Sequence, residues 1–190
     1  MTTRYLRFDE VEDVLTSLDL LALTVPLLKK QPGYWKWVAV AAHSGLQSAM
    51  VCALRDPAGI SILQKDCARE MMEWFDHKRG ECPKERLADF ETLLRRCRKA
   101  GQMDGQPLKL SEVQTKDVKR LHKEIRNEFA HFAPKGWSIE KAGLPRIILA
   151  AVGATEALMS HPRVSNQLNG NRKGRLTERL RVIRAKLIAK

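Results

Sequence analysis

The chain has 190 residues, of which 44% are hydrophobic and 29% are charged, and its formal net charge is +12 at pH 7. This length and composition suit one folded domain with a real core, which excludes a disordered polymer. We expect no membrane span, because no apolar run approaches the roughly 18–20 residues that a span requires. We expect no signal peptide either, since the N-terminus turns acidic where an apolar stretch would be needed. The sequence therefore predicts a soluble, cytoplasmic protein.

Helical signals dominate the chain, and alternating strand patterns are nearly absent. Asp9 resembles the N-cap of the first helix, and Pro26 is expected to kink or shorten that same helix. Ser111 opens a capping box with Gln114. The segment 34–55 carries few charges, so we predict that it forms the central, most buried helix. In chain order, the spacing of apolar residues predicts helices over residues 9–30, 34–55, 62–77, 84–99, 111–134, 145–159 and 176–188.

These elements predict an all-α, up-and-down bundle of about five to six helices over residues 1–165. A polar linker over 166–174 and a short basic helix over 176–188 are expected to follow, as a tail outside the bundle. The four cysteines recur every 15 residues, without the two-to-four-residue spacing of zinc ligands. Reduced, mostly buried thiols are therefore expected, with no metal and no cofactor.

The excess of positive charge is concentrated in the tail. Between Arg163 and Lys190, nine Lys or Arg stand against Glu178 as the one acid, so this segment carries +8 of the net +12. Such a segment favours a polyanionic partner, with nucleic acid ahead of a lipid surface, although a solvated helix face that aids solubility is the plainer alternative. The predicted nucleic-acid ligands are Arg172, Lys173, Arg175, Arg179, Arg181, Arg184 and Lys186.

The end of the helix over 111–134 carries the groups best suited to chemistry. Arg126, Asn127 and His131 place a fixed cation, an amide and a titratable ring within about 1.5 helical turns. The chain must leave the helix just after them, and loop borders are where sites are usually exposed. The pattern Arg126-Asn127-x-x-x-His131, late in a helix of an all-α chain, resembles the Arg-x(4–6)-His signature of the HEPN superfamily.

The resemblance implies a metal-independent enzyme that cuts RNA and leaves a 2′,3′-cyclic phosphate. Such cleavage needs a base for the 2′-hydroxyl proton, an acid for the leaving oxygen and positive charge on the phosphorane. His131 would act as general acid and base, Arg126 would bind the phosphate, and Asn127 would position the ring or the phosphate. RNA is the expected partner, and many HEPN enzymes belong to toxin or phage-defence systems, where a cognate antitoxin can occur.

Helical geometry complicates this assignment. Five positions separate Arg126 from His131 by roughly 140° around a straight helix axis. The apolar stripe through Leu121, Ile125, Phe129 and Phe132 lies between them. Either the last turn unwinds, or two chains face each other and pool their motifs. HEPN enzymes commonly do the second, so we predict a homodimer with both motifs at the interface.

Five further residues have weaker interpretations, among them Trp137, which either packs against the protein or contacts a nucleotide. Glu128 is either a surface charge or a partner that restrains Arg126. Glu124 shares a helix face with the motif and is a candidate supporting residue, whereas His122 is expected to lie on the helix surface. His43 interrupts the most apolar helix, where it is either a hydrogen-bonded core histidine or part of the cleft.

Three classes of function stay open. A HEPN-like endoribonuclease is the first. A non-catalytic HEPN-like module that binds RNA or a nucleotide is the alternative, and an all-α DNA-binding protein that reads through its tail helix is a further one. The absence of a phosphate-binding glycine loop and of paired carboxylates at metal-binding spacing argues against a nucleotide-hydrolysing P-loop protein and a two-metal nuclease.

Overall fold

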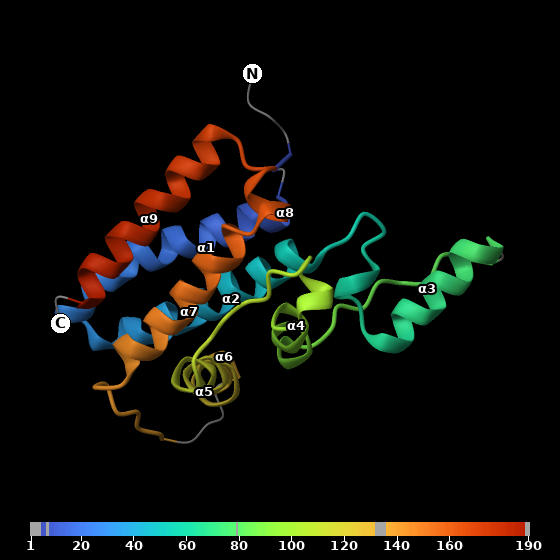
Figure 1. Cartoon of the computed structure of the whole chain (residues 1–190). Helices are drawn as coiled ribbons and strands as arrows, with labels where there is room; N and C mark the ends of the chain where they lie inside the picture. Colours follow the sequence, from blue (N-terminus) through green and yellow to red (C-terminus); the bar gives the residue numbers. More distant parts are fainter. Residues whose placement is uncertain (1–4, 7, 79, 132–135, 189–190) are drawn as a thin grey trace.

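A computed structural model describes residues 5–6, 8–78, 80–131 and 136–188 of the chain (Figure 1). Over these residues the chain is all-α, as predicted, and the one pairing of β type is an isolated bridge between Leu63 and Leu87. Phe132 and Pro134, which the apolar pattern assigned to the stripe and to the helix end, lie outside the described residues.

The helices follow the predicted order with local differences. They are α1 (Glu10–Thr24), η1 (Val25–Lys29), η2 (Pro32–Tyr34), α2 (Trp35–Leu54), η3 (Ile60–Ile62), α3 (Lys65–His77), α4 (Phe90–Cys97), η4 (Ala100–Gln102), α5 (Glu112–Arg120), η5 (Leu121–Arg126), α6 (Asn127–Ala130), α7 (Leu144–Met159), α8 (Pro162–Ser165) and α9 (Gly170–Ile188). The caps are confirmed, because Asp9 accepts from the Glu12 amide and Ser111 and Gln114 form the capping box.

Two predicted boundaries are wrong. The helix expected from residue 84 begins only at Phe90, because Arg86 and Ala88 hydrogen-bond in extended form to the segment before α3. The linker expected over 166–174 ends at Asn169, whose side chain accepts from the Arg172 amide in the first turn of α9. Local helix propensity alone predicts neither the extended pairing before α3 nor the cap at Asn169.

Helix α2 lies at the centre and packs against α1, α4 and α7, as its composition predicted (Figure 1). Gly45 permits the close approach of α1, since a Cβ there would lie 3.2 Å from that of Ser17. By length and composition, Pro32–Leu54 is also apolar enough to cross a membrane, contrary to the expectation that no segment reaches that limit. Two thirds of its most apolar window (67%) is buried inside the bundle, the position of a core helix.

Helix α9 is packed into the bundle. It lies along α1 and contacts α7 (Figure 1), and it buries one row of its side chains, Leu176, Leu180, Ile183 and Leu187. Its arginines form ion pairs with acids of α1 and α7, namely Arg172 with Asp9 and Glu12, Arg175 with Glu12 and Asp19, Arg179 with Asp19, and Arg184 with Glu156. The predicted free tail is therefore a structural helix.

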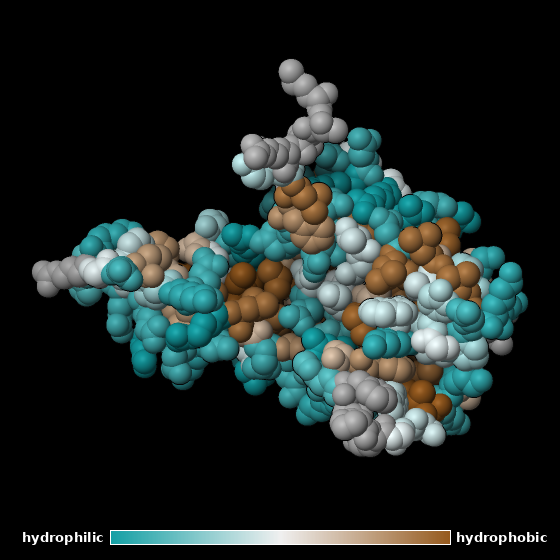
Figure 2. Space-filling model, turned by 180° about the vertical axis from the view of Figure 1, so that it is seen from behind, coloured by the Kyte–Doolittle hydropathy of each residue, from teal (hydrophilic) through white to brown (hydrophobic). Residues whose placement is uncertain are grey.

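An arm carrying α3 protrudes from the body (Figures 1 and 2). The segment after α3 runs back along it, where the Cys67 thiol lies 3.4 Å from the Lys84 carbonyl and the Trp74 indole donates to the Gly80 carbonyl. Cys67 and Met71 face this inner side, whereas Met72 and Phe75 remain exposed. The arm thus has a small core of its own.

Candidate active site

The helix that carries the motif changes its winding before the motif. Helices α5, η5 and α6 are continuous, and η5 is a π-helical segment, which places more residues in each turn than an α-helix. At its end His131 leaves the helical conformation, with φ −117° and ψ 54°. The π-helical segment ends at Arg126, so the residues between Arg126 and His131 are α-helical and the departure begins at His131 itself.

The result is a direct contact within one chain. Arg126 Nη1 donates to Asn127 Oδ1 at 3.1 Å and lies 3.3 Å from His131 Nε2. The last turn does not unwind before His131, because the His131 amide still donates to the Asn127 carbonyl, and the Arg126 side chain reaches the His131 ring within one chain. The geometric reason for pooling motifs from two chains is thereby removed, and the predicted homodimer rests on the HEPN resemblance alone.

The three side chains differ in exposure. His131 is exposed, and Arg126 and Asn127 are half-buried. Arg126 has no acceptor of its own, so it donates to His131 Nε2 only when that nitrogen is unprotonated and the ring carries its proton on Nδ1. Both contacts use Nη1, which leaves the Nη2 and Nε groups of Arg126 as donors to an anion. The cluster therefore places an imidazole nitrogen beside a cationic, fork-shaped donor.

Comparison with known proteins does not identify the chain. No protein-family model, curated protein or solved structure matches it. In the part of the chain that the structure describes, no group of three or more His, Cys, Asp or Glu side chains is arranged to hold a metal ion. The function must therefore be argued from the geometry of the side chains themselves.

A second histidine cluster lies directly behind the motif. His43 Nε2 and His122 Nδ1 are 2.9 Å apart, and Phe90 of α4 stacks on both rings, with centroids 4.6 Å and 4.4 Å away. His43 is 4% exposed, so it is the hydrogen-bonded core histidine of the plainer interpretation and does not line an open cleft. The expectation for His122 is wrong, because its ring is half-buried against α2 and α4. Only the packing of three helices could reveal this cluster.

Burial, together with the nearby charges of His122 and Arg126, lowers the pKa of His43 to about 3. Burial also lowers the pKa of His122, where Arg126 acts in the same direction and Glu91 opposes it. His43 is therefore neutral at pH 7, and one ring of the pair donates to the other.

The buried His43 predicts a loss of stability in mild acid. Its pKa is about 3 in the folded protein and near 6.5 in an unfolded chain, so below pH 6.5 the unfolded chain binds the extra proton. This contribution to stability is complete above pH 6.5 and is lost as the pH falls toward 3. Between pH 6.5 and 5, urea unfolding should show a loss of about 2 kcal/mol that His43→Gln lacks. Equal pH slopes for both proteins would contradict the assignment.

The two glutamates of the motif region lie on the other side of the helix. Glu124 forms an ion pair with Arg120 at 3.0 Å. Glu124 and Glu128 line a small pocket of about 260 Å³ together with Trp137. The Trp137 ring meets Phe129 edge to face at 4.9 Å, as the packing interpretation of this tryptophan expects. The carboxylate oxygens of Glu124 are thus engaged away from the Arg126–His131 contact.

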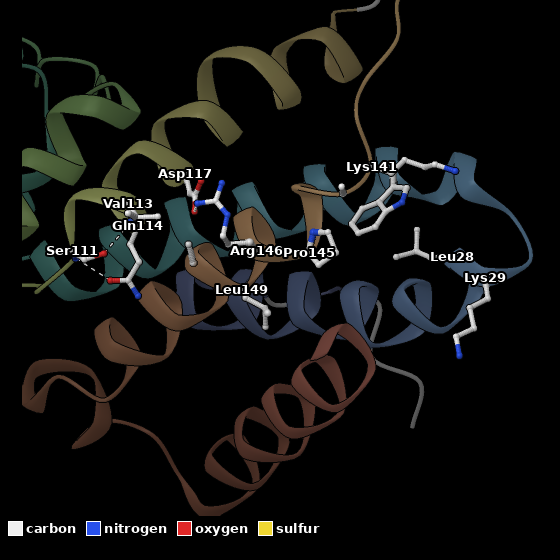
Figure 3. Close-up of a pocket in the computed structure, with 13 residues that line it drawn as sticks. Leu28, Lys29, Ser111, Val113, Gln114, Asp117, Lys141, Pro145, Arg146 and Leu149 are labelled. Atoms are coloured by element: carbon white, nitrogen blue, oxygen red, sulfur yellow. Dashed lines mark hydrogen bonds and ion pairs between the residues drawn. The ribbon is translucent and has the colours of Figure 1, made fainter. Parts of the chain in front are cut away.

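A larger groove of about 1200 Å³ lies between α5 and α7 (Figure 3). Asp117 of α5 is 4% exposed and pairs with Arg146 of α7 at 2.7 Å. The groove is lined by apolar and polar side chains, among them Leu28, Lys29, Val113, Lys141, Pro145 and Leu149, and by none of Arg126, Asn127 and His131. The volume of this groove therefore does not locate the candidate active site.

The predicted nucleic-acid ligands of the tail lie on another part of the bundle. Helix α9 packs on α1 and α7, whereas the motif lies on α5, η5 and α6, which pack on α2 and α7. Besides the ion pairs to α1 and α7, Arg181 pairs with Glu178 on its own helix. Lys173 and Lys186 are exposed.

Proposed function

We propose that the protein is a metal-independent endoribonuclease of HEPN type, built on a HEPN-like helical bundle. The observation that carries the proposal is the contact of the Arg126 guanidinium with both Asn127 and His131 at an exposed helix end. The π-helical segment before it supports this reading, since such irregularities recur at functional sites. Metal-free RNA cleavage requires a proton acceptor beside a phosphate ligand, and this contact supplies both.

In the proposed mechanism, the bound phosphate draws Arg126 Nη1 away from His131, and the freed lone pair of His131 Nε2 takes the proton of the RNA 2′-hydroxyl as its oxygen attacks the adjacent phosphorus. The Nη2 and Nε groups of Arg126 donate to the non-bridging oxygens, where negative charge builds up in the transition state. Asn127 keeps the guanidinium in place through its Oδ1 atom. The bond from phosphorus to the 5′-oxygen breaks, and that oxygen takes a proton from His131 of the partner subunit in a homodimer. The products are a 2′,3′-cyclic phosphate and a 5′-hydroxyl.

A non-catalytic RNA-binding module is the second candidate. It is favoured by the mutual hydrogen bond of His43 and His122, which ties up the two imidazoles behind the motif. In such a module Arg126 and Asn127 would bind a phosphate, and no proton would be transferred.

Cleavage of a labelled single-stranded RNA in EDTA tests the proposal. The wild-type protein should cut the RNA and leave cyclic-phosphate ends, while DNA of the same sequence stays intact because it lacks the 2′-hydroxyl. Loss of a general acid-base group should slow His131→Ala by about 100- to 10,000-fold. His77→Ala is the matched control, because His77 is an exposed histidine at the end of α3.

Binding without cleavage by all three proteins would support the RNA-binding module instead. A protein that neither binds nor cuts RNA would contradict both candidates.

A further inference from the structure

Most of the positive charge of α9 is already engaged by the protein itself. Asp19 accepts hydrogen bonds from both Arg175 and Arg179. Burial raises the pKa of Asp19, but these hydrogen bonds outweigh it and hold the pKa below its usual value. Releasing these arginines to phosphates would leave half-buried carboxylates of α1 unpaired, at a cost in stability. The net charge of this helix therefore overstates its affinity for RNA.

A second row of cations runs along α5 and η5 and ends at the motif. Lys116 and Lys119 lie on α5, and Lys123 and Arg126 follow on the π-helical η5 at three- or four-residue spacing. The three lysines are exposed. Neither Lys116 nor Lys119 forms an ion pair with an acid of the described chain. From Lys116 to Arg126 the row spans about 15 Å.

The electrostatic neighbours show where this row faces. Lys123 Nζ lies 2.9 Å from Glu91 Oε1 of α4. The hydrogen bond from Lys123 lowers the pKa of Glu91, and the charge of Lys119 acts in the same direction. His122 lies beside them, because the charges of both Glu91 and Arg126 shift its pKa. Lys119, Lys123 and Arg126 therefore share the side of the helix next to the N-terminal turn of α4, and Glu91 is an acid among them.

We infer that Lys116, Lys119 and Lys123 form an RNA-binding track that leads the phosphates of a single strand to Arg126 and His131. The negative charge of Glu91 lowers the affinity of this track for RNA. The inference rests on the proposed RNA-directed function. Lysines on an exposed helix face suit such a track, because they contact phosphates as flexible point charges without reading sequence. The track is continuous with the phosphate ligand of the proposed reaction, which α9 is not.

Fluorescence anisotropy with a labelled 2′-O-methyl RNA about 12 nucleotides long tests the track. Blocking the 2′-oxygen prevents cleavage, so the assay measures binding alone. Lys116→Ala/Lys119→Ala should raise the Kd about ten-fold and reduce the salt slope by about 1.4, since each lost phosphate contact removes about 0.7. Alanine is favoured in exposed helix positions, so the variant keeps the fold. Lys65→Ala/Lys84→Ala removes the same charge from the arm of α3 and should change the Kd less than two-fold.

Glu91→Gln gives the complementary result. Removing this carboxylate frees Lys123 and ends the repulsion of phosphates, so the Kd should fall about three-fold. A damaged fold would not tighten binding, which makes the gain a stringent test.

The outcomes separate this inference from the function on which it rests. If the wild type binds the RNA but Lys173→Ala/Lys186→Ala on α9 weakens binding as much as the α5 variant does, the track is overturned and RNA binding stands. An unchanged or higher Kd for Glu91→Gln overturns it as well. A wild type that does not bind the RNA overturns the track and the proposed function together.

Discussion

Replacing Arg126 by lysine is expected to lower the rate of RNA cleavage by about 100- to 1,000-fold, although the positive charge is kept. The guanidinium touches Asn127 and His131 through one nitrogen and keeps its other donors for the phosphate. An ammonium is a compact point charge and lacks this planar fork, so it cannot hold Asn127 and clamp the phosphate at once. Single-turnover cleavage in EDTA, at saturating protein, measures the effect on the chemical step.

Arg69→Lys is the matched control for this substitution. Arg69 lies on α3, where its side chain is 68% exposed and its charge lies 3.9 Å from Asp66. Its replacement should leave cleavage unchanged. If Arg126→Lys cleaved as fast as the wild type, Arg126 would supply charge alone, and the proposed clamp on the transition state would be wrong.

Replacing Ile183 by alanine is expected to lower the free energy of unfolding by about 2–4 kcal/mol. Ile183 is fully buried in the row through which α9 packs into the bundle. Removing three carbons leaves a cavity there, because the rigid helices around it relax only in part. Urea denaturation at pH 7, followed by circular dichroism, measures the change.

Ile188→Ala provides the comparison on the same helix. Its side chain is 71% exposed, so the expected change is below about 0.5 kcal/mol. Equal, small effects of the two substitutions would mean that α9 does not pack on the bundle, and that the basic segment is the free tail that its composition suggested.

The parts of the fold that the sequence predicted are those governed by neighbours along the chain. Asp9 and Ser111 cap their helices because each side chain reaches an amide three residues later. Pro26 likewise ends the regular α-helix where expected, since α1 stops at Thr24 and a tight 3₁₀ turn follows. The boundary at Phe90 is wrong because partners distant in sequence decide it, whereas the one at Gly170 is set by a local cap, Asn169, that the sequence analysis did not use.

The candidate site likewise has a part that the sequence predicted and a part that only the tertiary structure decided. The spacing of Arg126, Asn127 and His131 was sufficient to single out these residues, because a helix end brings such neighbours close together. Their contact depends on the conformation of the long Arg126 side chain, which no local pattern predicts. The pairing of His43 with His122 joins residues 79 positions apart and requires Phe90 from a third helix.

The sequence by itself determined the helical class and the central position of α2, and it singled out Arg126, Asn127 and His131 as candidates, because apolar periodicity and short-range spacing act within a few turns of one helix. The tertiary structure decided which charged side chains are paired within the protein and which are available to bind a ligand. A count of Lys and Arg cannot tell that Asp19 lies opposite Arg175 and Arg179 while Lys116 and Lys119 form no ion pair within the described residues. Pairing depends on which helices pack together, and burial sets what each pairing costs to break.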